Sequence, residues 1–153
     1  MLKPHRVEID IKNIEYVCIK ITPTHGRQLQ VCCVYHPPSA PASWKDACYT
    51  LCNVLVSDPQ PCILLGDFNV DLLTDKSLAD DMAVTFGFTQ HISAPTRITS
   101  TTASLIDHVY TSGLDYITAA VTELHIADHC AVSCSLKPHR SEERRVGKEC
   151  LRL

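Results

Sequence analysis

The segment Cys62-Ile-Leu-Leu-Gly-Asp-Phe-Asn69 decides how this chain folds. It begins with a short, continuous apolar run, which is typical of a strand buried on both faces of a sheet. Gly66 interrupts the run, and Asp67 and Asn69 follow, so a carboxylate and an amide are expected where the strand leaves the core. Taken alone, the pattern Gly-Asp-x-Asn also indicates an ordinary turn in which a side chain bonds the backbone.

Two strands and one helix are predicted before this segment. Residues 17–21 and 29–35 alternate apolar with smaller or polar side chains, and the turn-prone residues 22–27 between them indicate a hairpin. His36-Pro37-Pro38 ends the second strand, because proline cannot extend a ladder. A helix is then expected to begin after an N-cap at Ser43, with Asp46 three residues on, and to end near Ser57. Its apolar face would consist of Trp44, Cys48, Leu51 and Leu55.

A second helix and three strands are predicted after the segment. Leu78, Met82 and Phe86 recur every four residues, and Gly87 stands where a left-handed residue would end the helix. Residues 93–104 are polar and indicate a loop. Apolar runs that predict strands then follow at 105–110, 117–121 and 130–136. The expected order is β-β-α-β-α-β-β-β, which places the chain in the α/β class.

The composition indicates one globular domain. The chain has 153 residues, of which 45% are hydrophobic and 20% are charged. No stretch approaches the ~18 consecutive apolar residues of a membrane span, and the first residues are not followed by the apolar core of a signal peptide. We therefore expect an intracellular protein, nuclear or cytoplasmic, that is not secreted and has no membrane partner.

The nine cysteines are expected to act mainly as small buried hydrophobes. They are too sparse for a secreted disulfide scaffold in a chain with this many apolar residues. A zinc site is the alternative, but neither Cys48-x3-Cys52 nor Cys130-x3-Cys134 has a matching second pair of ligands. Six of the cysteines lie in strand-like runs, namely Cys18, Cys32, Cys33, Cys62, Cys130 and Cys134.

The end of the chain differs from the rest. Residues 140–153 hold five of the 14 basic groups and three of the 17 acidic groups without any apolar period, so residues 1–139 carry a net charge of −5. The tail resembles the translation of a sequencing adapter, and a solvated charged tail is the alternative. We expect one domain over residues 1–139 and a non-native tail over 140–153. An acidic domain needs a metal or further sequence to hold a polyanion.

Three short segments place chemically active side chains directly after apolar runs. These are Gly66-Asp-Phe-Asn69, Ile106-Asp107-His108 and Ala127-Asp128-His129. Strand ends are where α/β sheets place their sites, since side chains there leave the core on a rigid backbone. Hydrolysis of a phosphodiester needs an oxygen-ligated Mg²⁺, a group that orients or deprotonates water, and a proton-rich group near the phosphate. Asp, Asn and His are the residue types that suit these tasks.

The order of the motifs resembles the endonuclease domain of LINE-type (non-LTR) retroelements, a branch of the endonuclease/exonuclease/phosphatase superfamily. This domain is similar to apurinic endonucleases and DNase I. The resemblance implies an α/β fold that is part of a four-layer α/β/β/α sandwich, with the N-terminal half missing. The segments that carry it are Val34-Tyr-His-Pro-Pro38, Gly66-Asp-Phe-Asn69, Pro95-Thr-Arg97, Ser104-Leu-Ile-Asp-His-Val-Tyr-Thr-Ser112 and Ala127-Asp-His129.

The resemblance also implies a role for each site residue. Asp67 and Asn69 would orient and activate the attacking water, and Tyr35 would contact the scissile phosphate. Asp107 would hold the imidazole of His129 in one tautomer, which suits a carboxylate beside a group that becomes charged. Asp128 would help to bind Mg²⁺, the expected cofactor. DNA is the expected substrate, and a reverse transcriptase domain is expected downstream in the parent polyprotein.

Two departures from the family pattern bear on activity. Ala127 stands where the family usually has serine, and the principal metal-binding glutamate of the early strands has no counterpart, because Glu8 and Glu15 lie in another context. We therefore expect a fragment of a DNA-nicking enzyme that is inactive by itself and exposes an apolar sheet face. The alternatives are a remnant with no enzymatic role and a phosphatase or sphingomyelinase of the same superfamily.

The remaining histidines are expected to be structural or solvated. His36 lies beside prolines and is expected to be exposed. His108 follows Asp107 and should face the opposite side of its strand, because side chains alternate along a strand.

Overall fold

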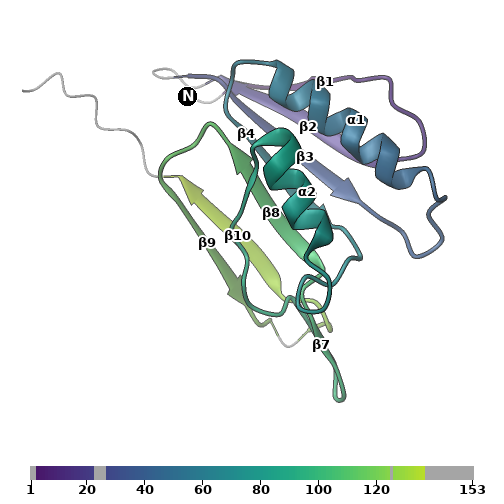
Figure 1. The fold of residues 1–153 in the computed structure, drawn as a ribbon. Coiled ribbons are helices and arrows are strands. Elements are labelled where there is room, and N and C mark those ends of the chain that lie inside the picture. The colour runs from purple at the N-terminus through teal and green to yellow at the C-terminus, as the bar shows by residue number, and fades with distance from the viewer. Residues whose placement is uncertain (1–2, 23–26, 125, 137–153) are drawn as a thin grey trace, which may run out of the picture.

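The computed structural model describes residues 3–22, 27–124 and 126–136 (Figure 1). Its elements follow one another as β1 (Lys3–Val7), β2 (Glu15–Thr22), β3 (Leu29–Tyr35), α1 (Trp44–Ser57), β4 (Cys62–Asp67), α2 (Ser77–Phe86), β5 (Thr89–Gln90), β6 (Arg97–Ile98), β7 (Ala103–Ser104), β8 (Asp107–Ser112), β9 (Ile117–Thr122) and β10 (Ala131–Leu136). The predicted order of the long strands and both helices is confirmed.

Six of the strands form one mixed sheet in the order β1-β2-β3-β4-β8-β5. Strands β3 and β4 are parallel, and the other neighbours are antiparallel. A parallel pair needs a crossover connection, which α1 supplies. Strands β3 and β4 end with Tyr35 and Asp67 at the same edge where their antiparallel neighbour β8 begins with Asp107.

Both helices cover one face of the sheet, as Figure 1 shows. The predicted apolar face of α1 is confirmed, since Trp44, Cys48, Leu51 and Leu55 are buried against β2, β3 and β4. The predicted face of α2 is confirmed as well, with Leu78, Met82 and Phe86 buried in the same cluster. Gly87 ends α2 in a left-handed conformation with φ of 69° and donates its N–H to the carbonyl of Ala83.

A second apolar cluster lies on the opposite face of β4 and β8. Ile63, Leu105 and Val109 are buried there, and side chains from β9 and β10 pack against them. Strands β9 and β10 pair only with each other, as a separate two-stranded sheet. The described residues therefore form a helix layer, a central sheet and a small second sheet, which is a mixed α/β fold and a partial domain.

The same face is open beside β2 and β3. Val17 is 52% exposed and Tyr35 is 41% exposed. Cys33 is exposed too, so its predicted burial is wrong. The reason is the alternation of β3, which turns Cys32 into the core under the helices and Cys33 to the uncovered side. Cys18 and Cys62 are buried as predicted, and Cys130 and Cys134 are partly buried.

Several local features were not predicted. Strands β1, β5, β6 and β7 were missed, because a run of two residues has no period and Lys3–Val7 is mostly polar. The predicted loop at 93–104 therefore contains a short hairpin of β6 and β7. Ser43 precedes α1 but makes no side-chain cap, because its backbone is already helical, so that prediction is wrong. Residues 23–26 of the predicted hairpin and the tail at 140–153 lie outside the described residues.

Within the described ranges, no helix is both long and apolar enough to cross a membrane.

Candidate active site

The turn after β4 depends on a glycine. Gly66 has φ of 141°, and a Cβ at this position would lie 1.9 Å from the carbonyl oxygen of Val34 on β3. Other residues rarely adopt this conformation, and the neighbouring strand leaves no room for a side chain. The backbone N–H of Asn69 then donates to Oδ1 of Asp67 over 2.9 Å, which confirms the expected side-chain to backbone turn. Asn69 itself has φ of 48°.

Register places four site-edge residues in one row across the sheet. Asp67 pairs with Tyr35 on one side and with Asp107 on the other. Tyr35 in turn pairs with Glu15 on β2. Neighbours in register point to the same face, so Tyr35, Asp67 and Asp107 share the face opposite the helices. Glu15 lies at the far end of this row, two strands from Asp67. The sequence offers no reason to count it among the site residues.

Asp107 and His129 form a hydrogen-bonded pair. Nδ1 of His129 lies 3.0 Å from Oδ2 of Asp107. An ionised carboxylate only accepts, so Nδ1 carries the hydrogen and Nε2 is the nitrogen left to act on a substrate. The side chain of Asp107 is 19% exposed and that of His129 is 37% exposed. The pair therefore lies at the surface edge of the sheet, where a ligand can reach it.

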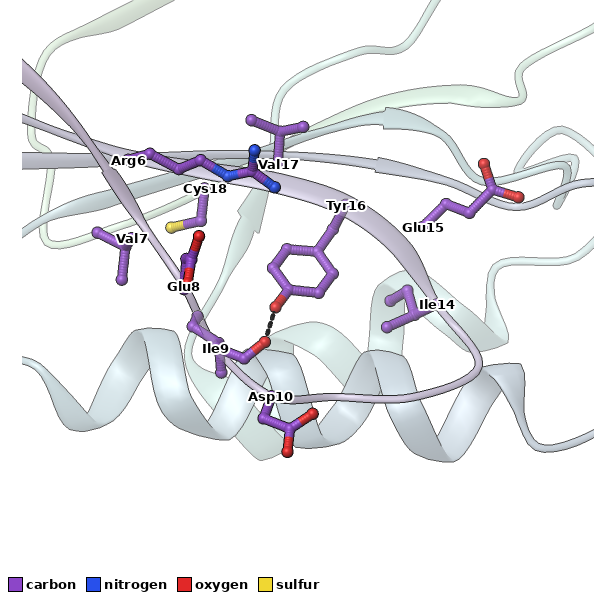
Figure 2. A pocket seen from close by; sticks show the side chains of 10 residues that line it. All are labelled: Arg6, Val7, Glu8, Ile9, Asp10, Ile14, Glu15, Tyr16, Val17 and Cys18. Carbon is purple, nitrogen blue, oxygen red and sulfur yellow. Dashed lines mark hydrogen bonds between the residues drawn. The ribbon is translucent and has the colours of Figure 1, made fainter.

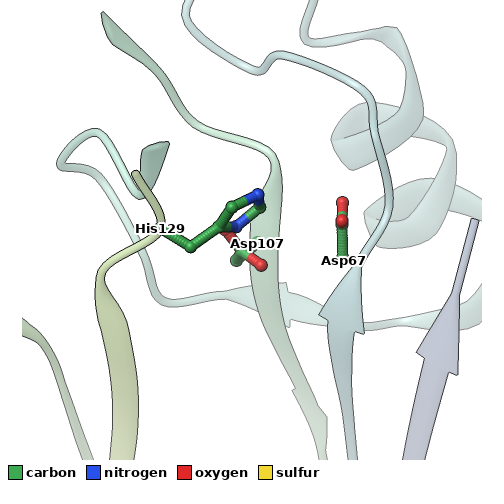
Figure 3. Close-up of side chains that lie close together, drawn as sticks. All are labelled: Asp67, Asp107 and His129. Atoms are coloured by element: carbon green, nitrogen blue, oxygen red, sulfur yellow. The ribbon is translucent and has the colours of Figure 1, made fainter. Parts of the chain in front are cut away.

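Asp67 joins this pair in a group that could hold a metal ion. Asp67, Asp107 and His129 each offer one ligand atom, and these atoms lie within 4.8 Å of one another. Figure 3 shows Asp67 at the end of its strand, facing the Asp107 and His129 side chains. Mg²⁺ prefers oxygen ligands and keeps several waters, so two carboxylates suit it and the imidazole is free for proton transfer.

The electrostatics of Asp67 agree with such a site. Burial raises the pKa of its carboxyl, and the charge of Asp107 raises it further. The Asn69 N–H, His129 and His36 act in the opposite direction, and the net effect is an increase. Two carboxylates that repel each other at a partly buried edge favour a proton or a cation between them. A carboxyl with a raised pKa is also better suited to accept a proton from water near neutral pH.

Thr96 holds the Asp107 and His129 segments together. In the sequence it stands out only as part of the Pro95-Thr-Arg97 motif. Its side chain is fully buried, and its Oγ1 accepts hydrogen bonds from the backbone N–H groups of Ile106, at 3.1 Å, and Asp107, at 2.9 Å. Its carbonyl accepts from the N–H of Cys130 at 2.7 Å. One residue thus links the strand of Asp107 to the segment of His129.

Asp128 lies apart from the metal-capable group. Nε of Arg97 donates to its Oδ2 over 2.7 Å, and both side chains are 44% exposed. The Arg97 guanidinium holds the pKa of this carboxyl below its usual range. Ile98 donates its N–H to the carbonyl of Asp128, so both the backbone and the side chain of Asp128 are fixed by residues 97 and 98. Its predicted role as a metal ligand stays a prediction.

The other two predicted residues lie on either side of Asp67. Asn69 donates its side-chain Nδ2 to the carbonyl of His36 over 2.6 Å, which leaves its amide oxygen for a water or substrate. Tyr35 ends β3 with its ring 41% exposed, beside Asp67 in register. The structure thus gathers five of the six predicted residues along one edge, and their roles in catalysis stay predictions.

The expectation for His36 was wrong, and that for His108 was right. His36 is partly buried, because its ring stacks on Trp44 and its Nδ1 bonds the carbonyl of Phe68. Neighbouring prolines gave no sign of this contact, although an aromatic residue eight positions on could have suggested a stacking partner. His108 faces away from Asp107 into the core, where it is 1% exposed and bonded to the carbonyl of Val70 and the hydroxyl of Tyr110.

A hollow elsewhere on the molecule is separate from this group. It has a volume of about 680 Å³ and is lined by residues 6–10 and 14–18 of β1, β2 and their connection. Figure 2 shows the Tyr16 hydroxyl pointing across it to the carbonyl of Ile9, with which it forms a hydrogen bond. None of the predicted site residues lines it, so this hollow is not the candidate active site.

Solved structures with the same fold are known. A protein of the endonuclease/exonuclease/phosphatase family from Leptotrichia buccalis matches with a TM-score of 0.61 and 12% identity, over 90% of this chain and 71% of its own. One from Bacteroides thetaiotaomicron matches with a TM-score of 0.51 and 19% identity, over 76% and 51%. The human Nocturnin catalytic domain with bound sulfate matches with a TM-score of 0.52 and 15% identity, over 88% and 60%.

These identities support the fold alone. The chain spans between 51% and 71% of the length of the three solved structures. No curated protein matches its sequence. The model of the endonuclease/exonuclease/phosphatase family matches residues 3–129, which includes all six predicted site residues. The chain therefore belongs to the endonuclease/exonuclease/phosphatase family.

Proposed function

We propose that this chain is part of a Mg²⁺-dependent phosphodiesterase that nicks DNA during retroelement insertion. The observation that carries the proposal is the convergence of Asp67, Asp107 and His129, whose ligand atoms lie within 4.8 Å of one another at one sheet edge. The retroelement assignment is supported by the ordered motifs of the sequence, from Val34 to His129. DNA, a downstream reverse transcriptase domain and an intracellular location belong to the same proposal.

The carboxylates of Asp67 and Asp107 would hold the metal. Bound Mg²⁺ would neutralise charge on the phosphate and make it easier to attack. If Asp128 is a further ligand, the cation must displace Arg97 from the Asp128 carboxylate. This exchange involves an exposed ion pair, which is a weak interaction in water.

The proton transfers are assigned to this chain's own residues. One carboxylate oxygen of Asp67 would face the metal, and the other accepts the proton of the attacking water as the new oxygen–phosphorus bond forms. Asn69 orients that water through its amide oxygen. His129, as the imidazolium that Asp107 stabilises through Nδ1–H, donates Nε2–H to the phosphate and stabilises the negative charge that develops on it. The bond between phosphorus and the leaving oxygen then breaks, and the leaving oxygen takes a proton from solvent.

The first test measures metal binding by the 153-residue chain. Mn²⁺, a paramagnetic substitute for Mg²⁺, should bind one site, and the double variant Asp67→Asn, Asp107→Asn should lose this binding. Asp115→Asn, at a distant turn, is the matched control and should bind as the wild type does. Equal Mn²⁺ affinity in the wild type and the double variant would show that the metal does not bind at this edge.

The second test measures nicking of supercoiled plasmid. The chain by itself is expected to be inactive, because the family's principal metal-binding glutamate has no counterpart in its sequence. In the longer parent protein, His129→Ala should lower the Mg²⁺-dependent nicking rate by about 10²-fold or more. Unchanged nicking by that variant would remove His129 from the mechanism, and a parent without any nicking activity would favour a non-enzymatic remnant.

A further inference from the structure

One residue outside the proposed catalytic set bonds three successive residues of the Asp67–Asn69 turn. The backbone N–H of His36 donates to the carbonyl of Asp67 over 2.8 Å. Nδ1 of its imidazole lies 2.6 Å from the carbonyl oxygen of Phe68. Its own carbonyl accepts from Nδ2 of Asn69 over 2.6 Å. Any neighbouring residue could supply the two backbone bonds, but only a side-chain donor can supply the third.

The contact with Phe68 fixes the state of the imidazole. A carbonyl oxygen can only accept, so Nδ1 carries a hydrogen whether the ring is neutral or charged. The carbonyl of Phe68 would otherwise be a partly buried acceptor beside an acidic group. The Phe68 side chain is fully buried and stacks on His108 at 4.8 Å between ring centroids. The turn is therefore anchored in the core by the Phe68 ring and bonded at its backbone by His36.

The imidazole is itself held in place by helix α1. Its ring stacks on Trp44 with 4.0 Å between centroids and 23° between planes. Trp44 is buried, contacts Phe68 edge-on at 6.2 Å, and donates its Nε1–H to the carbonyl of Tyr35 at 3.3 Å. Trp44 thus contacts the residue before His36 and the central residue of the turn, so the ring has little freedom to leave the Phe68 carbonyl.

We propose that His36 is a positioning residue of this site, whose Nδ1–H holds the Phe68 carbonyl and so fixes Asp67 and Asn69 relative to Asp107. Its relevance to catalysis rests on the proposed function, whereas its effect on the turn does not. The residue acts through the turn and needs no contact with the substrate.

Two substitutions separate the donor from the ring. His36→Asn keeps an N–H donor at the position of Nδ1 and loses the stack on Trp44. His36→Phe keeps an aromatic ring for Trp44 and loses the donor. If the Nδ1–H holds the turn, the Asn variant should resemble the wild type and the Phe variant should not. If stacking alone holds it, the order of the two variants is reversed.

The experiment uses the 153-residue chain labelled with ¹⁵N. The first measurement is hydrogen exchange of the Asn69 backbone amide, which bonds Asp67. His36→Phe should speed this exchange about five- to tenfold, as expected for a lost hydrogen bond, and His36→Asn should stay within about twofold of the wild type. Amides at the Cys134 to Leu136 end of β10, which pairs with the start of β9 away from His129, should exchange at the wild-type rate in both variants and serve as the fold control.

The second measurement is Mn²⁺ affinity, which should weaken in His36→Phe and recover in His36→Asn. A wild-type chain that binds no Mn²⁺ would count against the proposed function, while the amide exchange would still decide the role of His36. Wild-type exchange in His36→Phe, or equal acceleration in both variants, would overturn the inference. A Phe variant that fails to fold beside a folded Asn variant would support it, and failure of both would show that a side-chain donor alone does not hold the turn and would overturn it.

Discussion

The turn of Asp67 to Asn69 takes much of its geometry from four adjacent residues, whereas the pair of Asp107 and His129 joins side chains 22 positions apart through a third segment. In the turn, a glycine and a local side-chain bond set the backbone. In the pair, the hydroxyl and carbonyl of Thr96 connect β8 to the segment that carries His129. The turn should therefore be sensitive to backbone substitutions, and the pair should be sensitive to loss of one distant side chain.

The largest expected effect comes from Gly66→Ala. The new Cβ would lie 1.9 Å from the carbonyl oxygen of Val34, at a backbone φ of 141° that suits only glycine. We expect a loss of about 4 kcal/mol or more in the free energy of unfolding, or no folded chain. Urea denaturation measures it. Gly87→Ala is the control, because it also has positive φ but open space around it, and should cost about 1–2 kcal/mol. Equal losses would show that the clash with Val34 is unimportant.

A smaller effect is expected for Thr96→Val, which keeps the shape of the side chain and removes its oxygen. The backbone N–H groups of Ile106 and Asp107 then lose their acceptor in a buried place, at a cost of about 2–3 kcal/mol in total. Thr96→Ser keeps the oxygen and should lose about 1 kcal/mol. The measurement is urea denaturation together with NMR of the His129 Nδ1–H.

The imidazole signal distinguishes a site effect from general destabilisation. It should broaden or disappear in Thr96→Val and persist in Thr96→Ser, because only the former displaces Asp107 from His129. If the signal is the same in both variants, Thr96 contributes to stability without positioning the pair.

The smallest effect concerns pH, and its sign differs between two carboxylates of the site. Burial raises the pKa of Asp67 in the folded chain, so the folded state holds this proton more tightly than the unfolded state does. Its contribution to stability therefore falls as pH rises from the ordinary carboxyl range, about 4, through the raised pKa. Arg97 lowers the pKa of Asp128, so that contribution is present above the ordinary range and is lost as pH falls through the lowered pKa.

Urea denaturation in EDTA from roughly pH 3 to pH 7 measures both slopes. Relative to the wild type, Asp67→Asn should gain stability as pH rises, and Asp128→Asn should lose it. The effect of Asp128 should also shrink in high salt, because its ion pair with Arg97 is exposed. The same slope in both variants would contradict the electrostatic difference between the two residues.

Much of the fold could be predicted because its long elements have clear periods. The face of α1 from Trp44 to Leu55 and the buried strand after Pro61 lie where the sequence indicated. The two-residue strands β5, β6 and β7 could not be predicted, since a run of two residues has no period. They are defined only by their pairing, of β5 with β8 and of β6 with β7. The exposure of Cys33 beside the buried Cys32 also required tertiary structure, because only the sheet's packing decides which face is covered.

The residues of the candidate site could be named from the sequence, but their supports could not. Asp67, Asp107 and His129 were found because they lie beside apolar runs in a familiar order. Only Asp67 follows its strand as expected, since Asp107 begins β8 and His129 precedes β10. His36 was expected in solvent and instead bonds the Phe68 carbonyl, because Trp44 of α1 packs against its ring. Asp128 contacts Arg97, which comes from a hairpin 31 positions away, and its predicted role as a metal ligand stays a prediction. These contacts depend on where separate elements meet, which no local pattern records.

The sequence by itself determined the class of fold and the types of side chain at the strand ends. Only the tertiary structure decided that Asp67, Asp107 and His129 share one edge, that Asp128 pairs with Arg97, and that β9 and β10 cover only part of the second sheet face. The physical reason is how far along the chain each interaction acts. Backbone sterics and side-chain periodicity act over a few residues, whereas hydrogen bonds and packing between elements depend on the position of the whole chain.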